Sequence, residues 1–215
     1  MPQRWLRLVP LAAATVAVVL NTVGAFVLGG SSPGGSAGGQ QVVAYFASHK
    51  ADNQRWAILV AGTLLFFLVF VGFLRGYLRR VPHVELLSSL ALAGAVLFAT
   101  GFAASASLAA TLADSPKSLQ PAAAQALNAL NNGPIYAANV GSCVFAVAAG
   151  IAIILGASLP RWLGWVAVVL GLASLTPWAE FAYNTLLLWA FVTAVALYRR
   201  ERTAAPDAVT ITQLA

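Results

Sequence analysis

Charge is what this sequence has least of. Only 8% of its 215 residues are Asp, Glu, Lys or Arg, whereas 60% are hydrophobic. About a quarter of the residues of a soluble domain are charged. The composition therefore excludes an ordinary soluble domain. It predicts an all-α protein embedded in a membrane, because helices satisfy their own backbone hydrogen bonds in lipid.

Groups that perform chemistry are also scarce. The chain has two histidines, His49 and His83, and one cysteine, Cys143, in an apolar stretch. A single cysteine forms no internal disulfide, and this one is predicted to be a small buried residue. His83 and Glu85 form an isolated pair that is typical of a helix start. No phosphate-binding glycine motif and no catalytic triad can be assembled. We therefore predict a non-enzyme with no catalytic residue, no cofactor and no metal site.

The basic residues flank apolar runs. Twelve Lys and Arg against six Asp and Glu give a net charge of +6, but no basic face or motif accompanies them. This excludes nucleic acid as a partner. Arg outnumbers Lys by ten to two and Ala is abundant, which fits a bacterial source.

The chain is organised around the apolar run at residues 57–74. These eighteen residues, AILVAGTLLFFLVFVGFL, contain no charge. As a helix they would reach about 27 Å, close to the thickness of a bilayer's hydrocarbon core. Arg75, Arg79 and Arg80 follow, and basic residues stay on the cytoplasmic side of membranes. The run therefore predicts a membrane span and its direction.

The same reasoning predicts a polytopic bundle with both termini in the cytoplasm. Its six transmembrane helices are expected at about 8–28, 57–74, 84–112, 135–157, 162–176 and 179–198. Pro177 divides the last apolar stretch, because proline interrupts helices. This topology places nine of the twelve basic residues inside, as the positive-inside rule requires. They are Arg4, Arg7, Arg75, Arg79, Arg80, Arg161, Arg199, Arg200 and Arg202.

The sequence allows two alternatives to this topology. A single crossing over 162–198 would give five spans and place Arg199–Arg202 outside, against the rule. The first apolar run could instead be a cleaved signal peptide, although it is longer than a usual signal core and lacks a clear cleavage site.

The segments between the spans are expected to be simple. Residues 29–56 predict an outer Gly/Ser linker, flexible over 29–41, and then a short helix lying on the membrane surface. Residues 113–134 predict an outer loop with a short helix at 121–131. Pro82 is expected in the first turn of the next helix, and 201–215 as a disordered tail.

Small residues recur every four positions in the third and fourth spans. They are Ala91, Ala95, Ala99, Ala103 and Ser107, and Ala138, Ser142, Ala146 and Gly150. Membrane helices pack closely through such faces, so we expect these two spans to pack together. The alternative is contact with a membrane-protein partner or a second copy through Ala95, Ala99, Ala103, Ala146 and Gly150. The lipid bilayer is the other expected partner.

One polar group enters the spans from the outer side. Spacings of three and four place Glu180, Tyr183 and Asn184 on one helical face. Tyr136 and Asn139 enter the fourth span from the same side. Acids at membrane depth usually face a cavity or a polar partner, so these five residues predict a shallow ligand-binding pocket open to the outside.

Four more polar residues are expected near this pocket: Asn21, His49, Asp52 and Asp114. The alternative is that Glu180 lies among lipid headgroups, with Trp178 and Tyr183 as ordinary interface anchors.

Several segments carry a resemblance to known proteins. They are VVAYFASHKADNQRW at 42–56, FLRGYLRR at 73–80, ALNALNN at 126–132 and LPRWLGWVAVVLG at 159–171. The chain resembles actinobacterial six-span membrane proteins of unknown function over about residues 1–200, and is distantly similar to a widespread bacterial six-helix domain. The resemblance implies a multi-pass protein of the bacterial cytoplasmic membrane and no particular activity. We expect an accessory or structural membrane component, or alternatively a protein that binds or transports a small molecule or ion around Glu180.

Overall fold

The computed structural model describes residues 2–28, 32–114, 118–156 and 159–203, and no strand occurs among them. The chain is all-α, as the sequence predicts. Its helices in order are α1 (Pro2–Leu28), α2 (Gly39–Ser48), α3 (Lys50–Leu78), α4 (Glu85–Asp114), α5 (Pro121–Asn132), α6 (Pro134–Leu155), α7 (Arg161–Ala173) and α8 (Ala179–Thr203).

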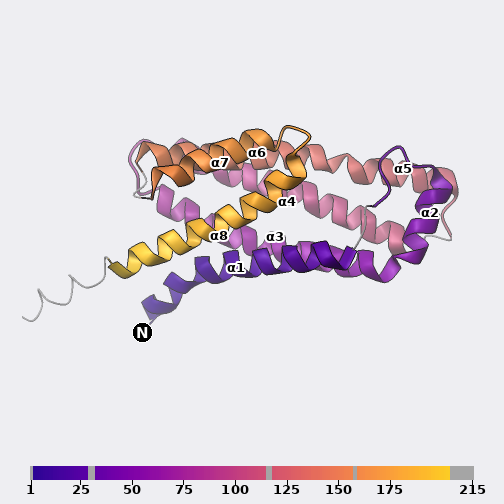
Figure 1. Ribbon diagram of the computed structural model, residues 1–215, viewed down its shortest axis with the longest axis horizontal. Coiled ribbons are helices and arrows are strands. Elements are labelled where there is room, and N and C mark those ends of the chain that lie inside the picture. The colour runs from indigo at the N-terminus through magenta and orange to yellow at the C-terminus, as the bar shows by residue number, and fades with distance from the viewer. Residues whose placement is uncertain (1, 29–31, 115–117, 157–158, 204–215) are drawn as a thin grey trace, which may run out of the picture.

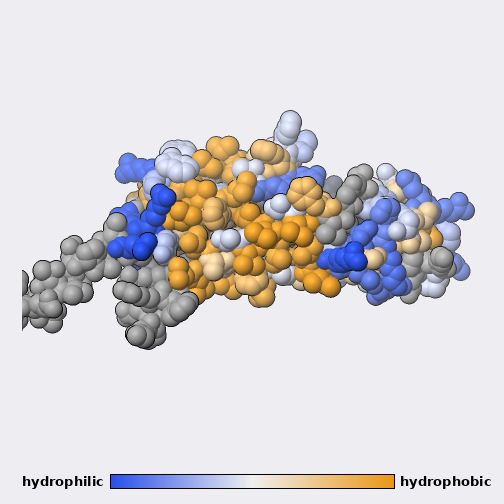
Figure 2. Space-filling model, turned by 60° about the horizontal axis from the view of Figure 1, so that its bottom comes forward, coloured by the Kyte–Doolittle hydropathy of each residue, from blue (hydrophilic) through white to orange (hydrophobic). Residues whose placement is uncertain are grey.

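Among the described residues, five segments are long and apolar enough to cross a membrane. They are α1, α3, α4, the continuous pair α5–α6, and α8. The fifth predicted span, 162–176, is shorter than expected, because α7 has only 13 residues and ends at Ala173. At 1.5 Å per residue it reaches about 20 Å, less than the roughly 30 Å hydrocarbon core. Figure 2 shows a broad apolar band between polar surfaces at the two ends of the molecule, as expected of a membrane-embedded protein.

The helices run along one long axis, and arginines gather at one end. Figure 1 shows the start of α1, the α3–α4 and α6–α7 connections and the end of α8 at this end. We call it the arginine end, after its exposed residues Arg79, Arg80, Arg161, Arg199 and Arg200. The opposite end is formed by α2 and α5 and is called the cap. His49 and His83 precede and follow α3, so its length separates them.

α4 and α6 pack closely, as their small residues predict. Ala95, Ala99 and Ala146 are buried between helices. The prediction was wrong for Ala103 and Ser107, which are exposed. A four-residue step turns a helix by about 400°, so the face drifts by about 40° each step and leaves the partner helix. The buried face of α4 continues instead through residues 105, 106 and 109.

α7 lies on α6 and ends early for local reasons. Gly150 of α6 and Gly164 of α7 bring the two backbones together. After Ala173 the chain turns, and the Ser174 hydroxyl donates to the carbonyl of Gly171 at 2.7 Å. Pro177 lies in this turn and α8 begins two residues later, so the predicted interruption is confirmed.

The cap packs more tightly than the sequence suggests. α2 buries Val42 and Phe46 against α5 and the end of α4, in a cluster with Leu112 and Ala124. A short helix is therefore present as predicted, but its apolar face is covered by α5 and the end of α4 and not by the membrane surface. Part of the predicted flexible linker is also held, because the Asn128 amide donates to the carbonyl of Gly34 at 2.8 Å. α5 occupies Pro121–Asn132, where a helix over 121–131 is predicted.

Two boundaries differ from expectation. Pro82 lies in a turn before α4 and not in its first helical turn, which contains Glu85. His83 has a positive φ of 67°, so the chain reverses there before it enters α4. α8 continues to Thr203, and the rest of the predicted tail lies outside the described residues.

Candidate functional site

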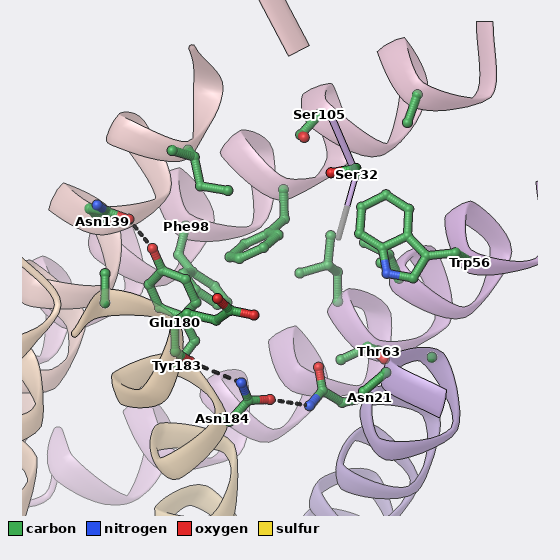
Figure 3. Close-up of a pocket in the computed structure, with 18 of the residues that line it drawn as sticks. Asn21, Ser32, Trp56, Thr63, Phe98, Ser105, Asn139, Glu180, Tyr183 and Asn184 are labelled. Atoms are coloured by element: carbon green, nitrogen blue, oxygen red, sulfur yellow. Dashed lines mark hydrogen bonds between the residues drawn. The ribbon is translucent and has the colours of Figure 1, made fainter. Parts of the chain in front are cut away.

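A large cavity lies between α1, α3, α4, α6 and the start of α8, on the side of the bundle nearer the cap. Its volume is about 960 Å³. That is the size of pockets that enclose drug-sized ligands, about 300–1,000 Å³. The turn that follows the short α7 borders the cavity through Leu175, Thr176 and Pro177. Figure 3 shows the residues around this space.

The first turns of α8 supply three polar side chains to the cavity. Glu180 lies in the first turn of α8, and Tyr183 and Asn184 follow one helical turn later. A carboxylate at this position is stabilised by the positive end of the helix dipole. Figure 3 shows the Glu180 carboxylate pointing into the space, where it makes no ion pair or hydrogen bond with the described residues.

Tyr183 connects α8 to α6. Its hydroxyl donates a hydrogen bond to the side-chain oxygen of Asn139. The backbone carbonyl of Asn139 in turn accepts from the Ser174 hydroxyl at 3.1 Å. Asn139 therefore joins both the turn before α8 and the first turns of α8 to α6.

Asn184 connects α8 to α1. The Asn21 amide donates to the Asn184 side-chain oxygen at 2.8 Å. The Asn184 amide then donates to the backbone carbonyl of Glu180, also at 2.8 Å. These two bonds place the Glu180 turn against α1 (Figure 3).

All five predicted ligand-binding residues line this one cavity, but in different ways. Asn139, Tyr183 and Asn184 use side-chain atoms to hold the helices together. Tyr136 is 73% exposed and lies at the rim. Glu180 is the charged residue of the five, and its carboxylate has no ion-pair partner within the described chain.

Three of the four additional residues lie elsewhere. Asn21 is in the lining, whereas His49, Asp52 and Asp114 are not. The His49 ring stacks on Tyr45 with centroids 4.6 Å apart. Asp114 accepts from the Gln54 amide at 2.6 Å, and Asp52 pairs with Arg55 at 3.5 Å. These residues are engaged in packing at the cap.

The interior of the cavity is aromatic, and sequence reasoning missed it. Phe98 and Phe102 of α4 contact the ring of Tyr183, with centroids 6.0 and 5.3 Å away. Phe98 also contacts Phe67 of α3 at 5.4 Å, deeper in the bundle. Phenylalanines in a span are ordinary core residues by sequence, so no local signal distinguishes those that border a cavity. Trp56 also lines the cavity, from α3 (Figure 3).

A second polar wall lies toward the cap. Asn53 and Ser105 are buried, and both line the cavity. The Ser105 hydroxyl lies 3.0 Å from both the carbonyl and the side-chain oxygen of Asn131. The Asn53 amide donates to the carbonyl of His49 at 2.9 Å. The cavity is thus polar near the cap and near Glu180, and apolar in between.

The charge content of the lining is very low. Within the described chain its residues include one carboxylate, Glu180, and no Lys, Arg, His or Cys. No group of three metal-ligating side chains occurs among the described residues. Cys143 lies outside the lining and is half-buried, which is less buried than the sequence predicts.

Comparison with protein-family models, with curated proteins and with solved structures returns no match for this chain.

Proposed function

We propose that this protein is a non-enzymatic, multi-pass protein of the bacterial cytoplasmic membrane that binds a small molecule with an apolar body. The observation that carries the proposal is the cavity of about 960 Å³, which combines an aromatic interior with polar groups from α1, α3, α4, α5, α6 and α8. Binding sites for small molecules are mostly apolar concavities with a few placed polar groups. A bundle that served only as a structural element would gain stability by filling such a space.

The proposed topology has six crossings with both termini in the cytoplasm. The start of α1 and the end of α8 lie at the same end of the bundle, which supports an even number of passes (Figure 1). Beside the five long segments, α7 and the turn at 174–178 provide the remaining pass, because they lead from the arginine end back to the start of α8. The positive-inside rule places the arginine end in the cytoplasm and the cap outside.

Cysteine labelling tests this topology. In a Cys143→Ser background, we expect a membrane-impermeant maleimide to label Gln125→Cys, in the exposed part of α5, in intact cells. Pro82→Cys and Arg202→Cys, both exposed at the arginine end, should react only after the cells are opened. Labelling of Arg202→Cys but not Pro82→Cys in intact cells would show five crossings.

The cavity supports binding more than catalysis. Glu180 is its one carboxylate, and no histidine, lysine or cysteine lies beside it in the described lining. General acid–base catalysis and nucleophilic catalysis use such groups in pairs. A ligand would enter from the outer side or from the lipid, past the exposed rim residues Tyr136 and Val140.

A matched pair of rim variants tests the binding function. Val140 lines the cavity and is 48% exposed, whereas Val192 of α8 is 40% exposed and lies outside the lining. Native mass spectrometry of protein released from lipid nanodiscs should show a small molecule retained by the wild type and Val192→Trp, and lost from Val140→Trp. Bare protein in all three, or retention by all three, would contradict the proposal. A co-purifying protein in place of a small molecule would favour an accessory membrane component.

A further inference from the structure

We propose that the ligand of this cavity carries a positively charged nitrogen on an apolar body. The inference rests on the proposed binding function and names the chemical class of the ligand. It follows from three features of the lining: its single charge, the hydrogen bonds already made by its other polar groups, and its aromatic rings.

The first feature is the sign of the charge. Glu180 contributes the one formal charge among the described lining residues, and no cationic side chain offsets it. Arg55, Arg161 and the other described arginines lie outside the lining. The Glu180 side chain is exposed at the rim of this apolar space, and an uncompensated carboxylate there attracts cations and repels anions. An anionic ligand would find no cationic side chain to pair with in the described lining.

The second feature is that the neighbouring polar groups are already committed. Tyr183 donates to Asn139, Asn21 donates to Asn184, and Asn184 donates to the Glu180 backbone. These bonds hold α8 against α6 and α1, so they position the Glu180 turn. The carboxylate itself makes none of these bonds and points into the space (Figure 3). It is therefore the group left to meet the charged part of a ligand.

The third feature is the aromatic lining beside this carboxylate. Tyr183 lies one turn from Glu180 on the same helical face, and Phe98 and Phe102 contact its ring. Cations, and quaternary ammonium groups in particular, are attracted to aromatic rings. Leu20, Leu59 and Val60 also line the cavity, are half-buried and offer apolar surface for a hydrocarbon chain. The order of carboxylate, aromatic rings and apolar interior matches an amphiphilic amine.

The test compares three ligands that share one alkyl chain. Radiolabelled decyltrimethylammonium, decanol and decanoate are titrated against protein in phosphatidylglycerol nanodiscs, with empty nanodiscs subtracted. We expect saturable binding of the cation at least tenfold tighter than that of the alcohol, and no saturable binding of decanoate. Glu180→Gln should remove the preference for the cation and keep the affinity for decanol, which also shows that the variant is folded.

Glu85→Gln is the matched control, because Glu85 is also an exposed acid in the first turn of a helix but lies outside the cavity lining. This variant should bind all three ligands as the wild type does. Glu180→Asp should keep the preference for the cation.

The remaining outcomes separate the inference from the function on which it rests. If the wild type binds decanol or decanoate saturably and as tightly as the cation, the inference is overturned. The proposed binding function would then still stand. An unchanged preference for the cation in Glu180→Gln would also overturn the inference. Absence of saturable binding by all three ligands would overturn both. Addition of phosphatidylethanolamine to the nanodiscs assigns the source: competition with the expected cation binding indicates a lipid ammonium headgroup, and its absence indicates a free amine.

Discussion

Gly94 of α4 and Gly141 of α6 lie backbone to backbone. A Cβ atom on Gly94 would come within 2.8 Å of the Gly141 carbonyl oxygen, and one on Gly141 within 2.7 Å of the Gly94 carbonyl oxygen. Since backbone atoms cannot rotate away, a side chain at either position would separate the two helices. This contact fixes α6, and through Asn139 it fixes the position of Tyr183 at the cavity.

The first prediction concerns this contact. Gly94→Ala or Gly141→Ala should lower the free energy of unfolding by about 1–3 kcal/mol, the usual cost of overpacking. Gly72→Ala on α3 is the matched control, because a Cβ there meets nothing within 4 Å. The control should change stability by less than about 0.5 kcal/mol, or raise it through helix propensity. Steric-trap unfolding in bicelles measures the difference, and equal effects of the three variants would refute the close approach.

The second prediction concerns the hydrogen bond between α8 and α6. Tyr183→Phe removes the donor to Asn139 and should cost about 0.6 kcal/mol, the average for such bonds between membrane helices. Tyr136→Phe removes an equivalent hydroxyl from the exposed rim and should leave the free energy of unfolding unchanged. Binding of the decyl ligands should weaken in Tyr183→Phe and not in Tyr136→Phe. Equal behaviour of the two variants, in stability and in binding, would show that this bond does not hold α8 in place.

The third prediction concerns the reversal before α4. His83 has φ of 67°, a conformation that costs a residue with a side chain about 1–2 kcal/mol. His83→Gly should therefore raise the unfolding free energy by about 0.5–1 kcal/mol, since part of the gain offsets the greater freedom of glycine in the unfolded chain. His49→Gly should lower it, because His49 has φ of −115° and its ring stacks on Tyr45. Thermal unfolding of both variants checks the contrast, and a loss of stability in His83→Gly would contradict the strain.

The fourth prediction concerns the attachment of α7 to α8. The buried Trp189 ring nitrogen donates to the carbonyl of Leu163 at 2.8 Å. Trp189→Phe should destabilise the protein by about 1–3 kcal/mol, from the lost hydrogen bond and the space left behind. Trp165→Phe makes the same change at a residue that is 60% exposed and should cost less than about 0.5 kcal/mol. Chemical unfolding in mixed micelles compares the two variants. If Trp165→Phe lowered the free energy of unfolding more than Trp189→Phe, the assigned packing of α7 would be wrong.

Local patterns accounted for the elements of this structure. The apolar run at 57–74 is a helix because eighteen uncharged residues have no other stable form in lipid, and the break at Pro177 follows from a missing backbone donor. The shared face of Glu180, Tyr183 and Asn184 follows from helical spacing alone. These features depend on residues within a few positions of one another, so a single sequence contains them.

The sequence was less informative where distant segments meet. The four-residue repeat identified the pairing of α4 with α6 but not its extent, since Ala103 drifts off the shared face. The packing of α2 onto α5 depends on two segments about 80 residues apart, so the sequence predicted the short helix but not the helices that cover its apolar face. The early end of α7 depends on a serine-stabilised turn, which periodicity does not reveal.

By itself, the sequence determined a helical, membrane-embedded chain with one polar face at the start of its last helix, because chain length, hydropathy and helical spacing are local properties. Only the tertiary structure decided that Asn21 meets Asn184 across 163 positions and that Phe67, Phe98 and Phe102 border an open space. In lipid, no hydrophobic drive selects which helices pair, and backbone fit and a few hydrogen bonds make that choice. The same fold places the turn after the short α7 at the border of the cavity.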